Sequence, residues 1–405
     1  MAKPKIRFNG YTEDWEQRKV SEITSSYSGG TPKAGTTEYY DGDIPFIRSG
    51  EIYGDTTELF ITEEGLNSSS AKMIHIGDIL YALYGATSGE VSRAKLDGAI
   101  NQAILAIVPN DEVNADFLVE WFRKEKAQIT DKYLQGGQGN LSAQIIKNLK
   151  VTIPMREEQN KIGEYFSKVN HLITLHQRKC EQTKTLKKHM LQKMFPQDGE
   201  KVPQIRFEGF TEDWEQRKLG DLVDRVTRKN QDLVSELPLT ISAQYGLIDQ
   251  NEFFDKRVAS KDVSGYYLIE NGEFAYNKST STDAPWGAIK RLDRYENGVL
   301  STLYIIFGIK ENNPVDSDFL VSYYSTNLWH KGIHEIAAEG ARNHGLLNIA
   351  PADFFATRLM IPQDIEEQKK IGKYFIELEA LITLHQRKCD ELKEVKKFML
   401  QNMFV

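Results

Sequence analysis

The stretch LITLHQRKC occurs twice in this 405-residue chain, at residues 172–180 and again, without a change, at residues 381–389. Nine identical residues that lie 209 positions apart indicate that a long segment of the sequence is duplicated. The sequence on both sides of each copy contains no proline, and apolar residues recur in it at heptad spacing. We therefore interpret each copy as the middle of a long helix.

The duplication extends beyond these nine residues. A fourteen-residue block near the N-terminus returns with two substitutions, and short blocks at the start and the end of each predicted helix return as well. A period near 200 residues is too long for a solenoid and indicates a duplicated domain. The matching blocks are IRFNGYTEDWEQRK (6–19) with IRFEGFTEDWEQRK (205–218), EEQNKIGEYF (157–166) with EEQKKIGKYF (366–375), and LQKMF (191–195) with LQNMF (400–404).

Two stretches between the repeated blocks, residues 20–153 and 219–361, do not resemble each other. A chain of this length is expected to form two domains, each with its own core. The segment PQDGEKVP after the first helix has the composition of a turn and linker. We predict a first domain at residues 1–153, a central helix and linker at 154–199, a second domain at 200–361 and a C-terminal helix at 362–405.

The apolar stripe of each predicted helix runs for about five heptads, which is typical of a helix that needs a partner. The simplest partner is the other helix. If the two pair antiparallel, the two halves of the chain are related by a pseudo-twofold axis that passes near His176 and His385. The alternative is that each helix packs on its own domain. The predicted seam consists of Ile162, Val169, Leu172, His176, Leu186, Ile371, Leu378, Leu381, His385 and Leu392.

The composition is that of an ordinary globular protein, with 40% hydrophobic and 27% charged residues. The net charge of −7 argues against a protein that is basic all over, but residues 171–195 carry six Lys or Arg and one Glu. No apolar run approaches the ~20 residues of a membrane span, and the start of the chain lacks the apolar core of a signal peptide. Two cysteines cannot form a disulfide framework. We expect a cytoplasmic protein that does not contact a membrane.

Motifs that carry catalysis are missing from the sequence. It has no G-x-G-x-x-G and no G-x-x-x-x-G-K-[ST], and its nearest approach to the tetrapeptide of adenine methyltransferases is NNPV (312–315), which lacks the second proline and the aromatic residue. His330 and His334 have a spacing that can hold zinc, but no further ligands accompany them. We expect no catalytic residue and no metal site in this chain. Trp15 and Trp214 lie in the repeated block, and we interpret them as packing anchors.

Both variable regions contain Gly-rich polar motifs in a characteristic order. The first contains GGTPKAGTTEYYDGDIPFIRSGEI (29–52), GDILYALYGATSG (77–89) and INQAI (100–104). The second contains ISAQYGLIDQNEFF (241–254), YNKST (276–280), GAIKRL (287–292) and GVLSTLYIIF (298–307). With the EEQxKI helix starts, these motifs make the whole chain resemble the specificity subunit of Type I restriction-modification enzymes.

The resemblance implies an α+β fold with two mixed α/β target-recognition domains and an antiparallel coiled coil. Each domain would read one half of a bipartite, asymmetric site in double-stranded DNA, and the coiled coil would set the spacer between the half-sites. The helices would also dock two modification subunits, which methylate adenine with S-adenosylmethionine. Restriction subunits would join them and cleave DNA with ATP and Mg, in defence of the host. The chain itself would bind no cofactor.

The residues that read DNA are expected among the polar side chains of the glycine-rich loops, because Arg, Lys, Asn, Gln, Ser and Thr contact base edges and phosphates. For each of them the competing interpretation is a solvated loop residue. The candidates are Lys33, Arg48, Ser49, Tyr84, Thr87, Ser88, Gln102, Gln138 and Asn140 in the first domain, and Arg228, Lys229, Gln244, Tyr245, Asn277, Lys278, Ser279, Thr280, Ser281, Arg342 and Asn343 in the second.

Two other classes of protein remain as alternatives. One is an enzyme, either a fused modification-specificity protein or a nuclease, whose motifs would have to lie in this chain. The other is a coiled-coil scaffold that binds proteins through two variable domains, which composition and periodicity alone do not exclude.

Overall fold

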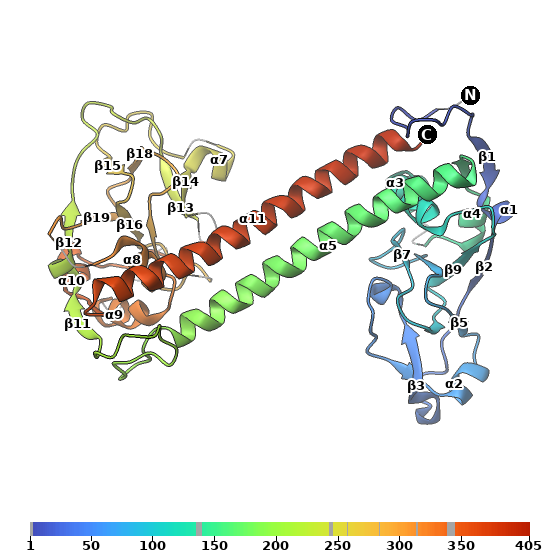
Figure 1. Cartoon of the computed structure of the whole chain (residues 1–405), viewed down its shortest axis with the longest axis horizontal. Coiled ribbons are helices and arrows are strands. Elements are labelled where there is room, and N and C mark those ends of the chain that lie inside the picture. The colour runs from blue at the N-terminus through green and yellow to red at the C-terminus, as the bar shows by residue number, and fades with distance from the viewer. Residues whose placement is uncertain are drawn as a thin grey trace. The chain divides into compact units, whose positions relative to one another are not determined.

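The computed structural model describes residues 3–134, 140–242, 246–256, 258–282, 284–312, 315–337 and 345–405. The chain divides into two compact units: unit 1 is Met1–Arg178 with Gln386–Val405, and unit 2 is Lys179–His385. Each division falls inside one copy of LITLHQRKC. Each unit therefore contains one variable region, the start of one long helix and the end of the other (Figure 1). The domain boundaries expected from the sequence remain a prediction.

Unit 1 is built around a four-stranded antiparallel sheet with the strand order β2-β9-β6-β7. A second four-stranded sheet has the order β4-β3-β8-β5, in which β3 and β8 are parallel. β1 pairs antiparallel with β10. The strands are β1 (Glu16–Lys19), β2 (Thr24–Ser28), β3 (Tyr40–Ile47), β4 (Phe60–Ile61), β5 (Lys72–Ile74), β6 (Ile79–Ala82), β7 (Val91–Arg93), β8 (Gly98–Ile100), β9 (Ile104–Pro109) and β10 (Lys150–Ile153). The helices are α1 (Val20–Ile23), η1 (Thr37–Tyr39), η2 (Ser49–Glu51), α2 (Glu63–Asn67), α3 (Ala115–Leu134) and α4 (Ala143–Asn148).

Unit 2 repeats the first sheet with the order β12-β19-β16-β17, and β11 pairs with β20 as β1 does with β10. The rest of its variable region differs, with separate β13-β14 and β15-β18 pairs. The strands are β11 (Glu215–Lys218), β12 (Val223–Val226), β13 (Leu239–Ser242), β14 (Gly246–Asp249), β15 (Tyr267–Glu270), β16 (Phe274–Asn277), β17 (Ala288–Arg291), β18 (Asn297–Leu300), β19 (Ile305–Ile309) and β20 (Arg358–Ile361). The helices are α6 (Leu219–Leu222), α7 (Gln250–Phe254), α8 (Ser317–Tyr323), α9 (Leu328–Ile336) and α10 (Pro351–Ala356).

The two long helices predicted from the repeat are present, as α5 (Arg156–Lys193) and α11 (Ile365–Met403). Both begin with two glutamates, which the positive end of the helix dipole favours. Each carries a glycine in its second turn where a neighbouring helix approaches closely. A Cβ atom on Gly163 would lie 2.6 Å from Asn114 Oδ1, and one on Gly372 would lie 2.6 Å from the Phe319 backbone nitrogen. The close approach explains why both copies keep glycine there.

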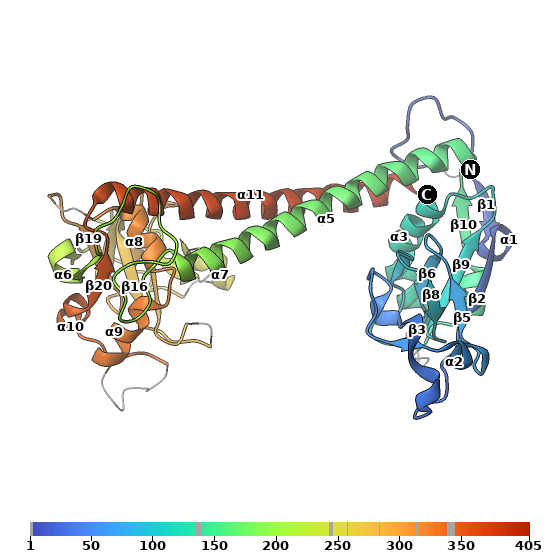
Figure 2. The ribbon, with the colours of Figure 1, turned by 60° about the horizontal axis from the view of Figure 1, so that its bottom comes forward.

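The start of each long helix is fixed to its unit by the repeated EEQ motif. In unit 1 the Arg7 guanidinium donates two hydrogen bonds, of 2.7 and 2.8 Å, to the buried carboxylate of Glu158. Arg206 donates the same pair to Glu367 in unit 2. A bidentate Arg–carboxylate pair is strongly directional. The two repeated blocks of each half, IRF and EEQ, are therefore bonded partners. The start of α5 lies close to the N-terminal segment of unit 1 (Figure 2).

The end of each long helix completes an aromatic core. In unit 1 the Phe404 ring, which follows α11, lies 6.4 Å from Trp15, 5.2 Å from Phe117 and 5.8 Å from Phe166. In unit 2 the ring that follows α5, Phe195, makes the same contacts with Trp214, Phe319 and Phe375, at 5.8 to 5.9 Å. The prediction that the two tryptophans are packing anchors is confirmed, since both are buried.

The buried stripe of the long helices corrects part of the predicted seam. Buried and half-buried positions follow one heptad pattern, with spacings of four and three residues. Leu172, Leu186 and Leu381 lie outside it and are 41, 45 and 44% exposed. The other seven predicted residues lie within it. The stripe consists of Ile162, Phe166, Val169, Ile173, His176, Cys180, Thr183, Lys187, Met190 and Met194 in α5, and Ile371, Phe375, Leu378, Ile382, His385, Cys389, Leu392, Lys396, Met399 and Met403 in α11.

The aromatic core of unit 1 gives a direct stability test. We expect Phe404→Ala to lower the free energy of unfolding of unit 1 by about 3–5 kcal/mol, because it leaves a cavity among three aromatic rings. Hydrogen exchange of α3 and of the first half of α5 would measure the loss. Phe398→Ala, on the same helix but 55% exposed, is the matched control and should have little effect. Equal protection in both variants would contradict the role of Phe404.

Candidate nucleic-acid interface

The structure brings two of the predicted loops together at the same place in each unit. In unit 1 the loop that follows β6 meets the residues that precede α4: Tyr84 forms a β-bridge with Asn140, and the Leu141 amide donates to the Leu83 carbonyl at 2.8 Å. Ser88 donates its hydroxyl to the Gly85 carbonyl at 3.0 Å, which closes a turn. Tyr84, Thr87, Ser88 and Asn140 thus lie on one pair of loops.

In unit 2 the loop that follows β16, the counterpart of β6, makes an equivalent contact. The Thr280 amide donates to the Gly345 carbonyl at 2.7 Å, and the Leu347 amide donates to the Lys278 carbonyl at 2.9 Å. Ser279 forms a β-bridge with Leu346. Asn277 Oδ1 accepts from the Ser279 amide, and Ser281 Oγ accepts from the Ala284 amide. All five predicted residues of this loop, 277–281, are therefore part of one ordered turn.

Two predicted arginines are already paired with carboxylates. Arg48 donates to Glu51 and to Glu58 at 2.8–3.0 Å, and these bonds raise its pKa. The same Arg48 contact lowers the pKa of Glu51 to about 2. Arg228 contacts Glu273 at 3.0 Å and Glu270 at 3.2 Å. Both arginines have a structural role in their loops, so a role in reading DNA would require these pairs to open.

Some of the other predicted residues form hydrogen bonds within the protein, and others are exposed. The Gln102 amide oxygen accepts from the Thr31 hydroxyl at 2.6 Å. Lys229 donates to the Gly265 carbonyl at 2.9 Å and lies over the ring of Tyr267, 4.0 Å from its centroid. Lys33 is exposed, and Ser49 begins the short helix η2. Gln138, Gln244, Tyr245, Arg342 and Asn343 lie outside the described residues.

One basic residue that the sequence analysis missed lies close to the unit 2 loop. Arg225 is an exposed residue of β12. Burial lowers the pKa of Lys278, and the positive charge of Arg225 lowers it further, so the two cations are neighbours. Arg225 lies outside the Gly-rich motifs, and only the pairing of β12 with β19, which itself pairs with β16, reveals its position.

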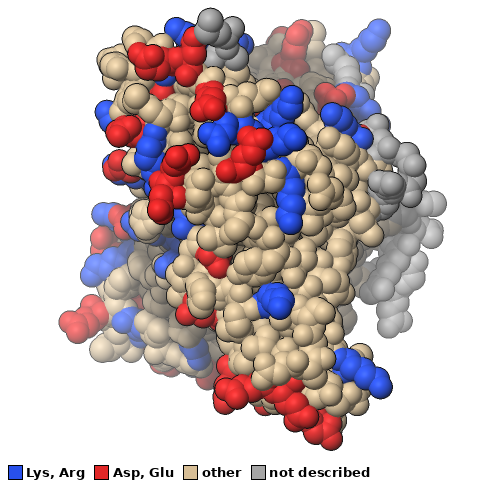
Figure 3. Space-filling model, turned by 90° about the vertical axis from the view of Figure 1, so that its right-hand side faces the viewer, with Lys and Arg blue, Asp and Glu red and all other residues tan. Residues whose placement is uncertain are grey.

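Basic side chains do not dominate the surface of unit 1 that Figure 3 presents. The centre of this face is mostly free of Lys, Arg, Asp and Glu, and charged residues of both signs lie across its upper part, along the left side of the view and at its lower end. A footprint built mainly on phosphate contacts would need a concentrated basic patch.

The described residues include no group of three or more His, Cys, Asp or Glu that could hold a metal ion. His330 and His334 each contact a tryptophan ring, Trp329 and Trp286 respectively. Cys180 and Cys389 are both buried in the helix stripe, and neither forms a disulfide. Within the same described ranges, no helix is both long and apolar enough to cross a membrane.

Comparison with known proteins agrees with this architecture. The family model of the Type I restriction modification DNA specificity domain matches residues 12–185. The MjaIX specificity subunit of Methanocaldococcus jannaschii is 28% identical over 228 residues, which is 52% of this chain and 52% of that protein. The chain spans about half the length of the first curated relatives it matches. The putative MjaX specificity subunit of the same organism is 24% identical over 95% of this chain and 91% of its own.

A solved structure extends the agreement to the fold of the whole chain. The S subunit of the Type I restriction-modification system of M. genitalium superposes with a TM-score of 0.65 at 12% identity, over 100% of this chain and 99% of that one.

The two units share a central sheet order, an edge-strand pair and a pair of contacting loops, and they differ in the rest of their variable regions. Residues 12–185 match the family model of the Type I restriction modification DNA specificity domain. Over most of its length the chain is similar in sequence to a putative Type I specificity subunit, and in fold to an S subunit of a Type I restriction-modification system.

The Arg48–Glu51 pair predicts a pH dependence. The pKa of Glu51 is about 2 in the folded protein and ~4.3 in an unfolded chain. The pair therefore stabilises the loop above about pH 4.5, and this contribution is lost as the pH falls toward 2. Carboxylate NMR titration should give Glu51 a midpoint near 2, and Arg48→Ala should raise that midpoint toward the ordinary value. An unchanged midpoint in Arg48→Ala would show that Arg48 is not the cause.

Proposed function

We propose that this chain is the non-catalytic DNA specificity subunit of a Type I restriction-modification complex, and that each unit reads one half of a bipartite, asymmetric site. The observation that carries the proposal is the duplication of the family's domain. The family model covers most of unit 1, and unit 2 repeats its central sheet order, its edge-strand pair and its Arg–Glu pair. The remaining parts of the variable regions differ, as two different half-sites require.

The paired loops of each unit are the proposed reading elements. Their exposed and half-buried side chains are of the types that contact base edges and phosphates. In unit 1 they are Tyr84, Thr87, Ser88 and Asn140. In unit 2 they are Lys278, Ser279 and Thr280, with Arg225 beside Lys278 as a phosphate contact. Loops on a rigid sheet commonly carry recognition.

The long helices are proposed to form an antiparallel coiled coil with a pseudo-twofold axis through the two LITLHQRKC segments. Three observations support this. The buried stripes follow the 4-3 spacing of a coiled-coil seam. In unit 2 Lys187 of α5 pairs with Glu379 of α11. In unit 1 Lys396 of α11 and Asn170 of α5 both contact Glu120. Such a pair of helices would fix the spacer between the half-sites.

The proposed partners are two modification subunits and the restriction subunits that join them in the cytoplasm. S-adenosylmethionine, ATP and Mg belong to those subunits in this proposal. The outer face of the helices offers apolar side chains for docking: Leu172, Leu186, Leu381, Val395 and Phe398 are 41–55% exposed. Docking would require these side chains to act together, because it is contiguous exposed apolar patches that mark protein-binding surfaces.

Long-read methylation sequencing tests the proposal in the source organism. Deletion of this gene should remove one bipartite methyladenine motif from the genome, and exchange of residues 20–153 for those of another family member should change one half-site only. If every methylated motif persists after the deletion, this chain does not direct methylation. A change in both half-sites after the exchange would contradict the assignment of one half-site to each unit.

The helix length predicts the spacer. A heptad inserted into both copies of LITLHQRKC should lengthen the pair of helices by about 10 Å, which is about three base pairs at 3.4 Å each. The methylated motif should keep both half-sites and gain a longer spacer. Seven residues inserted after Gly199, in the linker, are the matched control and should leave the spacer unchanged. A changed half-site sequence would contradict the measuring role of the helices.

A further inference from the structure

Unit 2 contains a cavity of about 630 Å³ between the end of α5, strand β17 and the segment that joins α8 to α9. Glu379 and Ile382 of α11 line it as well. Small-molecule sites in proteins typically have volumes of ~300–1,000 Å³. The cavity is therefore large enough for a ligand of nucleotide size.

The equivalent place in unit 1 carries larger side chains. The equivalence follows from two matching ion pairs: Arg93 contacts Asp116 at 2.7 Å, and Arg291 contacts Asp318 at 2.8 Å. Counted from these aspartates, Glu120 and Arg123 of the continuous helix α3 correspond to Ser322 and Ser325. In unit 2 the helix ends at Tyr323, and a new helix starts only at Leu328. Ser325 and the segment between the two helices line the cavity of unit 2, where unit 1 has Arg123 and a continuous helix.

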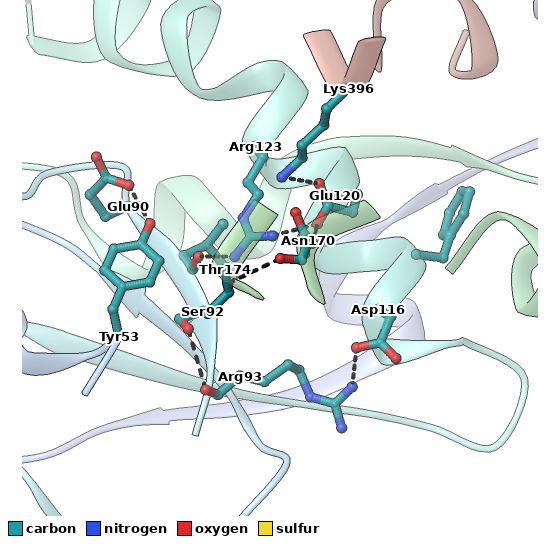
Figure 4. Close-up of polar contacts among 12 residues, drawn as sticks. Tyr53, Glu90, Ser92, Arg93, Asp116, Glu120, Arg123, Asn170, Thr174 and Lys396 are labelled. Atoms are coloured by element: carbon teal, nitrogen blue, oxygen red, sulfur yellow. Dashed lines mark hydrogen bonds and ion pairs between the residues drawn. The ribbon is translucent and has the colours of Figure 1, made fainter. Parts of the chain in front are cut away.

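In unit 1 the equivalent place contains a buried carboxylate, that of Glu120, with its hydrogen-bond and ion-pair partners. Glu120 is buried and accepts hydrogen bonds from Arg123 and from Asn170, the latter at 2.8 Å (Figure 4). Lys396, on the end of α11, forms an ion pair with the same carboxylate at 3.2 Å. One buried carboxylate therefore compensates the lysine that the long helix brings into the unit.

Unit 2 lacks this carboxylate but has more lysines. Lys184, Lys187, Lys188 and Lys290 line the cavity, and Glu379 is the acidic residue among its lining residues. Lys187, the counterpart of Lys396, forms an ion pair with Glu379. Among the described residues the ammonium group of Lys290 has no ion pair within 4 Å and no hydrogen bond. Burial, and then the charge of Lys187, lower the pKa of Lys290. The charge of Glu379 acts in the opposite direction, but Glu379 is already paired with Lys187, so one carboxylate serves two lysines. A half-buried cation with incomplete compensation favours the binding of an anion.

Two buried hydrogen-bond donors also line the cavity without a partner. Tyr324 and Trp329 are each 8% exposed, and neither the Tyr324 hydroxyl nor the Trp329 indole nitrogen has a hydrogen-bond partner among the described residues. A buried donor without an acceptor costs about 1–3 kcal/mol. Donors and cations prevail in this lining, so the complementary ligand is rich in acceptors.

We propose that this cavity binds a small molecule that carries a phosphate or carboxylate group. The anionic oxygens lie between Lys290 and Lys187, and the body of the ligand lies against Trp329 and Tyr324. Such a site would make unit 2 responsive to a ligand other than DNA, and it does not depend on the proposed function.

Isothermal titration calorimetry of the full chain with inorganic phosphate, adenosine monophosphate and citrate tests the site and separates a phosphate ligand from a carboxylate ligand. At least one of these probes should bind with one-to-one stoichiometry. Lys290→Met, which keeps most of the side-chain volume, should weaken that binding at least ten-fold. Lys331→Met is the matched control, since this lysine is exposed and pairs with Asp198 outside the cavity lining. The control should bind as the natural chain does.

Ser325→Arg separates a cavity site from adsorption to surface lysines. It places in unit 2 the side chain that unit 1 carries at the equivalent position and should abolish binding by filling the space, although it adds a positive charge. Thermal unfolding would show that both variants fold.

Three results would overturn the proposal: no binding of any probe at 10 mM, roughly the upper end of useful ligand affinity; unchanged affinity in Lys290→Met; or binding retained in Ser325→Arg. Displacement of the bound probe by a DNA duplex, with an equal loss of DNA affinity in Lys290→Met, would assign the lysines to DNA phosphates and would also overturn it.

Discussion

The fold depends on two aromatic contacts made by the ends of the long helices. Phe195, at the end of α5, lies among Trp214, Phe319 and Phe375, while α5 itself begins in unit 1. Phe404 makes the reciprocal contact in unit 1 at the end of a helix that begins in unit 2. Neither unit has a complete core until the helix from the other half of the sequence arrives, because a buried ring of this size contributes several kcal/mol. The two halves must therefore fold with each other, which explains why the sequence repeats its helix ends as faithfully as its helix centres.

Because each long helix begins in one unit and ends in the other, its length is constrained. Each long helix is held at its start by the Arg–Glu pair and at its end by the phenylalanine. A glutamine fixes the start further: the side-chain amide of Gln159 donates to the Pro154 carbonyl at 2.8 Å, and that of Gln368 donates to the Pro362 carbonyl at 2.9 Å. A helix fixed at both ends cannot slide. The equal lengths of the two repeats between these anchors follow from that constraint, and so does their suitability as a spacer in the proposed function.

The long helices and the residues that anchor their ends could be predicted from the sequence, because the repeated blocks are the segments that pack against each other. The repeated blocks IRF, EEQ and MF proved to be contact partners, and both tryptophans proved to be core residues. The predicted seam differs from the buried stripe at Leu172, Leu186 and Leu381, which are 41–45% exposed. Hydropathy alone does not distinguish an apolar stripe that is buried from one that is exposed. The pairing of Arg48 with Glu51 depends on the short helix η2, which the sequence pattern did not predict. The proximity of Arg225 to Lys278 depends on how distant segments of the chain meet in space.

The two units share the contacts that position helix and sheet, but they differ in the side chains further along the helix. The Arg93–Asp116 and Arg291–Asp318 pairs keep helix and sheet in the same relation in both. One turn further along the helix the chemistry diverges: Glu120 and Arg123 fill unit 1, whereas Ser322 and Ser325 leave unit 2 open. The same relation of helix and sheet is therefore compatible with different side chains behind these pairs. Lys187 of α5 occupies in unit 2 the position that Lys396 occupies in unit 1, but unit 2 has Ser322 where unit 1 has the buried carboxylate of Glu120. Divergence of this kind can give one half of a symmetric protein a binding property of its own.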